Sequence, residues 1–350
     1  MNAGTATIDW LYREQLRVDA EWSVRDATGF TWWADQNAQR IEVVRRDHDP
    51  KLGESFLIRV STEVLCDLTL NDRALEAIGA TLMPFGSMAG PVYDVTTRRL
   101  TLCSTVRVHE KIRVWMAPLI SMAAVLQVGE ARIIGPRLPE WTGCGRFATS
   151  GHPDNGLRPT PDEMAEIIAV LVAPRGQSPS AWIGPEFEEA VNGYMMQQPS
   201  LGATSGKDGL TVEFPFGDVS SLCQMKADET HPRYGHGLHL RQSFPFKVAD
   251  ELAGIRLALE LNTEELAQDP AGYGFGSYCY RDDTLHFCSF WPNAIHRPGQ
   301  LPNLYFACMA RAQRMAQRFC NDDWSDLSSR TKAPDRLGFL GRLARTFGRK

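Results

Sequence analysis

The sequence lacks a long apolar run, an excess of positive charge and a leader-like N-terminus. Its longest uncharged apolar stretch, residues 114–129, has 16 residues, fewer than the about 20 that a membrane-spanning helix needs. The net charge of −5 argues against a protein that holds nucleic acid on a basic surface. Charged side chains interrupt residues 1–22, so we predict no secretory signal and a cytoplasmic protein.

Signatures of enzyme chemistry are also missing. The 350 residues contain no CxxC pair and no HExxH or GxSxG motif. Residues 202–208 resemble a phosphate-binding loop, but with one spacer residue too few, and Asp208 stands where Ser or Thr would hold magnesium. We therefore predict a protein that is not an enzyme, with no catalytic residue, no bound metal and no cofactor.

What the sequence does contain is an ordinary globular composition, with 43% hydrophobic and 23% charged residues. At about 150 residues per domain, its length suggests two domains. The eight cysteines are scattered through apolar patterns, which is typical of reduced, buried thiols.

One order of elements occurs twice along the chain. Residues 7–22 predict a helix, and 29–44 and the alternating stretch 56–64 predict strands. A short helix capped by Asn71 or Asp72, a hairpin over 92–108 and a closing helix follow. The second set consists of helices over 163–172 and 186–196, strands over 210–216, 222–226 and 237–244, a helix from Asp250, a hairpin over 276–291 and a closing helix over 302–319.

Sequence offsets support a duplication. Leu75 and Leu252, which begin matching Leu-x2-Ile-x3-Leu patterns in the two short helices, are 177 residues apart. Pro118 and Pro302 are 184 apart, and we predict that they open the two closing helices. The alternative is two unrelated α+β domains.

The resulting fold class is α+β, with two tandem modules of antiparallel sheet packed by helices. We place the first module at residues 1–139 and the second at 162–325. Residues 140–161 are rich in Gly and Pro without an apolar period, so we predict a linker. Residues 326–350 form a basic tail.

The element order helix, three strands, helix, two strands, helix resembles that of type III secretion chaperones and YbjN-like proteins. Residues 29–33 (Gly-Phe-Thr-Trp-Trp) and 119–130 look like bacterial tandem members of that superfamily, and the resemblance covers roughly 7–135 and 163–320. It implies a cytoplasmic, usually dimeric module that binds a segment of a partner protein through an exposed sheet and apolar patches. The superfamily has no catalytic signature, so no site residue carries over.

Four aromatic side chains near strand ends are candidates for gripping a partner segment: Trp32, Trp33, Phe244 and Trp291. Adjacent Trp32 and Trp33 must face opposite ways in an extended chain, so one of them would lie on an outer face. The alternative is that all four anchor the core.

The closing helix of the first module carries no charge on any face over residues 114–129. Such a helix is usually covered on both sides. We predict that it forms the seam of an intramolecular pseudo-dimer or of a homodimer, and the alternative is a core helix inside one module. The seam residues would be Trp115, Leu119, Met122 and Leu126.

The second hairpin offers the alternative function, a metal-dependent enzyme or sensor. Cys279, His286 and Cys288 share one face of the predicted hairpin, where a metal ion fits their spacing. His236 and His239 point to opposite faces of their strand and cannot share an ion. Other members of this His-rich region are His231 and His296, and cross-strand packing of buried thiols is the simpler interpretation.

The tail carries apolar residues at helical spacing among arginines, a pattern that suits weak contact with an anionic membrane surface or an acidic partner. Its predicted contact residues are Leu337, Leu340, Leu343, Phe347, Arg342 and Arg345. A solvated terminus is the alternative.

Overall fold

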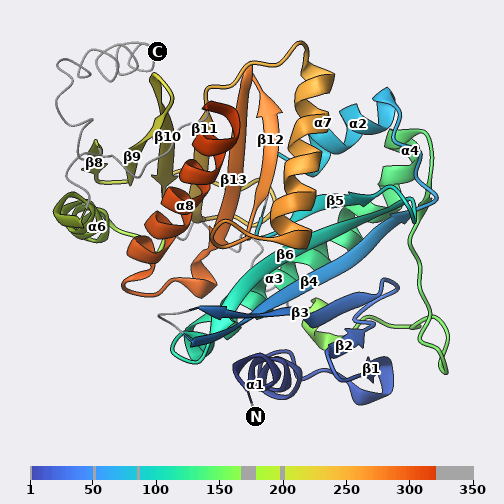
Figure 1. Ribbon diagram of the computed structural model, residues 1–350. Coiled ribbons are helices and arrows are strands. Elements are labelled where there is room, and N and C mark those ends of the chain that lie inside the picture. The colour runs from blue at the N-terminus through green and yellow to red at the C-terminus, as the bar shows by residue number, and fades with distance from the viewer. Residues whose placement is uncertain (1, 50–52, 85–86, 167–178, 198–201, 321–350) are drawn as a thin grey trace.

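The computed structural model describes residues 2–49, 53–84, 87–166, 179–197 and 202–320. It contains two antiparallel sheets with helices packed on them (Figure 1). The first sheet is built from the N-terminal half of the chain and the second from the C-terminal half. This arrangement confirms the predicted α+β class with two tandem sheet modules. The basic tail, with its six predicted contact residues, lies outside the described residues.

The first sheet has the strand order β1-β2-β3-β4-β6-β5, with β7 paired to β4. Helices α1 and α3 cover one of its faces. The elements of this half are α1 (Ala3–Trp10), η1 (Leu11–Gln15), η2 (Ala20–Trp22), β1 (Ser23–Arg25), β2 (Gly29–Trp32), β3 (Gln39–Asp49), β4 (Gly53–Cys66), α2 (Asp72–Thr81), β5 (Gly90–Asp94), β6 (Arg99–His109), α3 (Arg113–Ile134), η3 (Gly135–Arg137), α4 (Leu138–Thr142) and β7 (Arg146–Phe147).

The second sheet has the order β12-β13-β11-β10-β9-β8, and α7 and α8 pack on one of its faces. Its elements are α6 (Gly184–Gln197), β8 (Ala203–Gly206), β9 (Gly209–Phe216), β10 (Val219–Lys226), β11 (Gly237–Phe244), α7 (Glu251–Asn262), η4 (Thr263–Gln268), β12 (Ser277–Arg281), β13 (Thr284–Pro292), η5 (Asn293–Ile295) and α8 (Gln300–Cys320).

The two sheets have the same connectivity. In each, antiparallel strands lead to a short helix, and the following hairpin places its second strand beside the last strand of the meander. The short helices even begin alike, because Asn71 accepts a hydrogen bond from the backbone N–H of Ala74, and Asp250 accepts one from Ala253. The shared order supports a duplicated unit.

One predicted match between the modules is wrong. Helix α3 begins at Arg113, where the N–H groups of Trp115 and Met116 already bond to the carbonyl of Ile112, so Pro118 lies inside the helix. Pro302, in contrast, lies in the first turn of α8. The two prolines are therefore not equivalent, and a helix can begin before a proline when its preceding turn is already formed.

The modules exchange backbone contacts reciprocally. The segment before β12 crosses to the first sheet, where Gly274 and Thr105 of β6 exchange two N–H to carbonyl bonds of 2.9 and 3.2 Å. The segment before β5 crosses to the second sheet, where the carbonyl of Ser87 accepts the N–H of Phe290 in β13 at 3.0 Å. Each hairpin thus binds the segment that leads into the other hairpin, as expected of a pseudo-two-fold pair.

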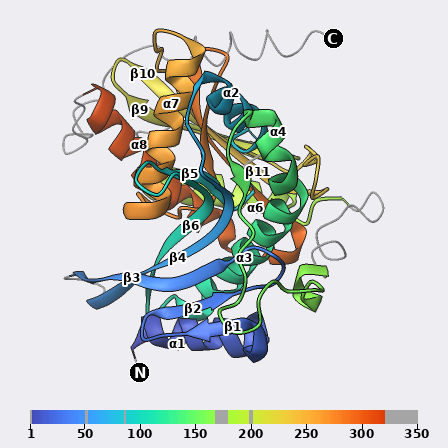
Figure 2. The ribbon, with the colours of Figure 1, turned by 90° about the vertical axis from the view of Figure 1, so that its right-hand side faces the viewer.

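Side-chain contacts between the two modules join their interiors into one continuous core. Helices α2 and α7 lie side by side (Figures 1 and 2), with Gly79 against Ile255. Arg45 and Arg107 of the first sheet both bind the carboxylate of Asp269, at 2.6 and 3.2 Å. The buried apolar cluster runs through both halves. The two modules therefore pair within one chain.

Helix α3 contacts the second module at Trp115, near its start, and at Glu130, near its end. Trp115 contacts Tyr273, with ring centroids 6.0 Å apart, and the Tyr234 hydroxyl donates to Glu130 at 2.9 Å. Between these points α3 packs on β4 and β6 of its own module, with Leu119 and Leu126 buried and Met122 half-buried. Helices α2 and α7, strands β5 and β6, and η4 form other parts of the seam.

The apolar character of this region has a simple structural reason. By length and composition, Arg113–Thr142 would cross a membrane, but 72% of its most apolar window is buried in the protein. A core helix of a soluble protein passes the same test.

Residues 140–161, predicted as a linker, lie along the first module. Asn37 donates to the carbonyl of Ala148 at 2.9 Å, and Arg158 donates to the carbonyl of Trp33 at 2.8 Å. A buried ion pair between Arg158 and Asp162 fixes the end of the segment. A stretch without apolar period is thus held by polar contacts to backbone.

Candidate functional site

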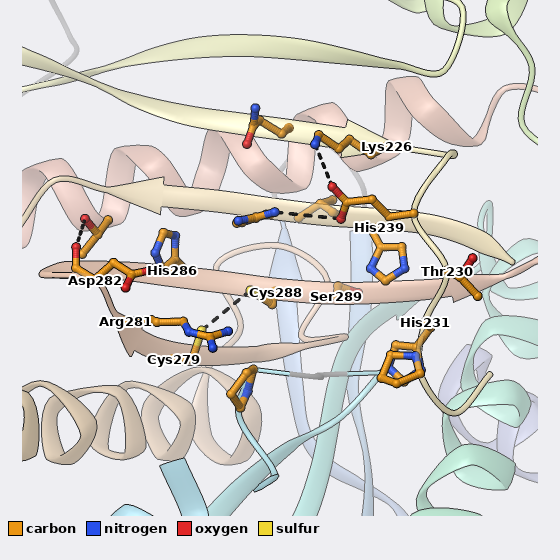
Figure 3. A pocket seen from close by; sticks show the side chains of 17 residues that line it. Lys226, Thr230, His231, His239, Cys279, Arg281, Asp282, His286, Cys288 and Ser289 are labelled. Carbon is orange, nitrogen blue, oxygen red and sulfur yellow. Dashed lines mark hydrogen bonds and ion pairs between the residues drawn. The ribbon is translucent and has the colours of Figure 1, made fainter. Parts of the chain in front are cut away.

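The face of the second sheet opposite α7 and α8 carries a groove of about 410 Å³ (Figure 3). Alternation along the strands sends Arg241, His286, Cys288 and Cys279 to this face, while Gln242 and Tyr278 point to the helices. The lining residues are Pro84, Gln224, Lys226, Glu229, Thr230, His231, Pro232, His239, Leu240, Arg241, Cys279, Arg281, Asp282, Thr284, His286, Cys288 and Ser289. Among the described residues, Pro84 alone represents the first module in this lining.

Charges of both signs surround the groove, with an excess of cations near its thiols. Lys226 binds Glu229 at 2.7 Å, and Arg241 lies 3.9 Å from the same carboxylate. Arg281 is exposed at the end of β12. Arg241 and Arg281 therefore give this end of the groove a positive potential.

Two histidines of the groove, His239 and His286, are held neutral. Burial, with a further contribution from the Arg241 charge, lowers the pKa of His286 to about 4. Its Nδ1 lies 2.8 Å from the Ser243 hydroxyl, which fixes the ring. Burial also lowers the pKa of His239. Neutral imidazoles leave Arg241, Arg281 and Lys226 as the cations of the groove at neutral pH.

Two thiols form the floor. The Sγ atoms of Cys279 and Cys288, on neighbouring strands, are 3.7 Å apart. Cys279 is buried and Cys288 is partly exposed. Register pairs Cys279 with His286 and Cys288 with Ser277, so the thiols are diagonal neighbours on one face.

The corresponding face of the first sheet is occupied by the second module. There Leu266 of η4 is fully buried against Val92 of β5 and Cys103 of β6. The Thr105 hydroxyl donates to the carbonyl of Leu266, and Arg59 donates to the carbonyl of Ala267 at 3.3 Å. A short segment of chain is thus bound through one apolar side chain and its backbone carbonyls.

The floors of the two sites correspond residue by residue. Thr105 and Phe290, which receive the crossing segments, each lie two residues after a cysteine, Cys103 and Cys288. In the hairpins, Cys103 pairs with Gly90 and Cys288 with Ser277.

Counting two residues along β5 and β12 then aligns Val92 with Cys279. The thiols of the groove therefore occupy the positions that hold Leu266 in the first sheet.

The predicted aromatic anchors are not part of this groove. Trp32, Phe244 and Trp291 are at most 1% exposed, and Trp33 is 5% exposed. Trp33 does leave the face that Trp32 occupies, but Ser150 and His152 cover it, with a 3.3 Å hydrogen bond and a 5.1 Å ring contact. The four side chains thus anchor the core: Ser150 and His152 cover Trp33, and the other three are fully buried.

The predicted metal alternative finds no support. Among the described residues, no three His, Cys, Asp or Glu side chains lie together in a way that would hold a metal ion. His286 is directed to Ser243 rather than to the two thiols. His296 lies elsewhere, 3.0 Å from Glu186 of α6.

The sequence analysis named the two thiols, His231, His239 and His286, but missed Arg241, Arg281, Glu229 and Pro84. The period of two in β11 places Arg241 on the same face as His239 and is visible in the sequence. Pro84 has no local signal, because it reaches the groove only through the crossing of the modules. Any functional assignment depends on these side chains, since no protein-family model matches the chain and no curated protein matches it significantly.

Proposed function

We propose that this protein is a non-enzymatic adaptor that holds a segment of a partner protein in the groove of its second sheet. The observation that carries the proposal is the occupied counterpart in the first sheet, where Leu266 and neighbouring backbone fill the same position. The equivalent face of the second sheet is an open groove, with Cys279 and Cys288 at the positions of Val92 and Cys103. The groove volume of about 410 Å³ suits a few side chains.

The side chains that line the groove indicate which kind of segment it would bind. The thiol floor favours an apolar side chain of leucine size, while Arg241 and Arg281 favour carboxylates beside it. The internal segment has this pattern, since Glu264 and Glu265 precede Leu266 and Asp269 follows it. We therefore infer a partner segment with an apolar residue between acidic ones.

The test uses the full chain and a labelled peptide with the sequence of residues 263–274. Fluorescence anisotropy should show binding, and replacing the leucine of the peptide by aspartate should abolish it. Arg281→Glu should weaken binding, whereas Arg256→Glu, an equal charge change at an exposed position of α7, should not. Equal binding by both variants, or no binding to the unmodified chain, would contradict the proposal.

A further inference from the structure

The thiols of Cys279 and Cys288 lie within reach of both each other and solvent. Their 3.7 Å separation is a sulfur–sulfur contact. Cys279 itself is buried, but Cys288 is partly exposed, and both line the open groove (Figure 3). A small reagent that enters the groove therefore reaches a lining that contains both thiols.

The surroundings favour the reactive form of Cys288. The contact between the two thiols, in which either sulfur can be the donor, together with the charges of Arg241 and Arg281 lowers the pKa of Cys288 against the effect of burial. The pKa of Cys279 is raised, first by its bond to Cys288 and then by burial. The two thiols thus share one proton-binding contact beside two arginines, which favours a thiolate in the pair.

We propose that Cys279 and Cys288 form a reversible oxidation site whose oxidant is a hydroperoxide such as hydrogen peroxide. The Cys288 thiolate attacks one peroxide oxygen, the O–O bond breaks, and the products are a sulfenic acid and hydroxide. The Cys279 sulfur then attacks the sulfenic sulfur, and its proton leaves with the hydroxyl group as water. In sum, two thiols and one peroxide give one disulfide and two waters.

The strand geometry limits how far the sulfurs must move. A disulfide needs a sulfur–sulfur distance of about 2.0 Å, so the 3.7 Å contact must shorten through side-chain rotation. Neighbouring strands in register hold both Cβ atoms on one face. A thiol reductant in solution then reverses the bond by exchange at the more accessible Cys288 sulfur.

A second thiol pair in the same sheet provides an internal control. Cys223 of β10 and Cys308 of α8 also hydrogen bond to one another. Both are buried, at 0% and 1% exposure, on the face that α8 covers. In both pairs the two thiols are adjacent, but only Cys279 and Cys288 line the groove. A reaction that needs access through the groove should therefore oxidise this pair and leave the other reduced.

The experiment treats the full chain with hydrogen peroxide, blocks remaining thiols under denaturing conditions and maps the peptides. Arg281 lies between the two cysteines in sequence, so trypsin separates them and a disulfide appears as a linked pair. We expect a Cys279–Cys288 link that a reductant removes, while Cys223 and Cys308 stay reduced. Oxidation of both pairs at equal rates, or conversion of Cys288 to sulfinic acid without a link, would overturn the proposal.

Variants test the mechanism without depending on partner binding. Cys279→Ser should leave a sulfenic acid on Cys288 that a dione probe captures, because the resolving thiol is gone. Arg281→Gln should slow oxidation several-fold, whereas Arg256→Gln should leave the rate unchanged. If Arg256→Gln slowed it equally, the electrostatic role of the groove would be refuted. Circular dichroism of each variant checks that it remains folded.

Discussion

Gly90 and Gly276 meet where the two modules cross. A Cβ added to Gly90 would lie 2.8 Å from the carbonyl oxygen of Gly276 and 2.6 Å from a methyl group of Leu266. Each glycine stands at the entrance to the first strand of its hairpin. This close approach leaves no room for a side chain at Gly90, where the segments that lead into the two hairpins cross.

We predict that Gly90→Ala destabilises the pairing of the modules. Overpacking of this kind typically costs about 1–3 kcal/mol, and the Cβ meets backbone at Gly276 that cannot rotate away. Urea unfolding should show a lower midpoint. Gly206→Ala is the matched control, because a Cβ there meets nothing within 4 Å. A Gly90→Ala midpoint equal to that of the control would show that the crossing tolerates a side chain.

Local patterns predicted the main strands and the two capped helices, whereas the single helix expected over 7–22 is divided into α1, η1 and η2. The alternation over residues 56–64 lies within β4, because one face of that strand packs on α3 and the other is partly polar. Asn71 and Asp250 cap their helices as expected, since capping depends on a side chain and the next three residues.

The relationship between the modules could not be predicted in the same way. Nothing in the sequence of residues 263–276 shows that Leu266 is buried against the other module's Val92 and Cys103. The covering of Trp33 by residues 148–158 likewise depends on tertiary contacts of a segment without apolar period. The shape of the groove depends on these long-range contacts, so the sequence indicated its thiols and histidines but not the groove itself.

The guanidinium of Arg311 neutralises the buried carboxylate of Glu265 in the second module. Its guanidinium is 1% exposed, donates to Glu265 at 2.7 and 2.8 Å and lies 3.5 Å from the ring centre of Phe287. Arg311→Leu should cost about 3–5 kcal/mol, because the buried Glu265 loses its counter-charge.

A second substitution should recover part of that loss. Glu265→Gln in the Arg311→Leu background removes the uncompensated charge but keeps an oxygen to accept the 2.7 Å bond from Tyr278. Chemical unfolding of the wild type, the single variant and the double variant measures the recovery. A double variant less stable than Arg311→Leu would contradict the account.

We predict that Glu130, at the seam between the modules, makes the stability of the protein depend on pH. Burial raises the pKa of this carboxyl, which accepts the Tyr234 hydroxyl at 2.9 Å. The folded state therefore binds a proton more tightly than the unfolded state does, and stability falls as pH rises above the unfolded value of about 4.3. Glu130→Gln should reduce this fall in urea unfolding measured from pH 5 to 8. Glu188→Gln, at an exposed position of α6, should leave it unchanged; a wild-type slope in Glu130→Gln would refute the assignment.

We predict that His286 makes the stability of the protein depend on pH with the opposite sign. Its folded pKa of about 4 lies below the ordinary 6.5, first because of burial and then because of Arg241. Between these values the unfolded chain binds the proton and the folded chain does not, so this histidine makes stability fall as pH drops from 6.5 towards 4. His286→Gln keeps a polar partner for Ser243 but cannot titrate, so its stability should fall less over that range than that of the wild type. His48→Gln, on an exposed part of β3, controls for removing a histidine. If both variants changed the slope equally, the neutral state of His286 would not be the cause.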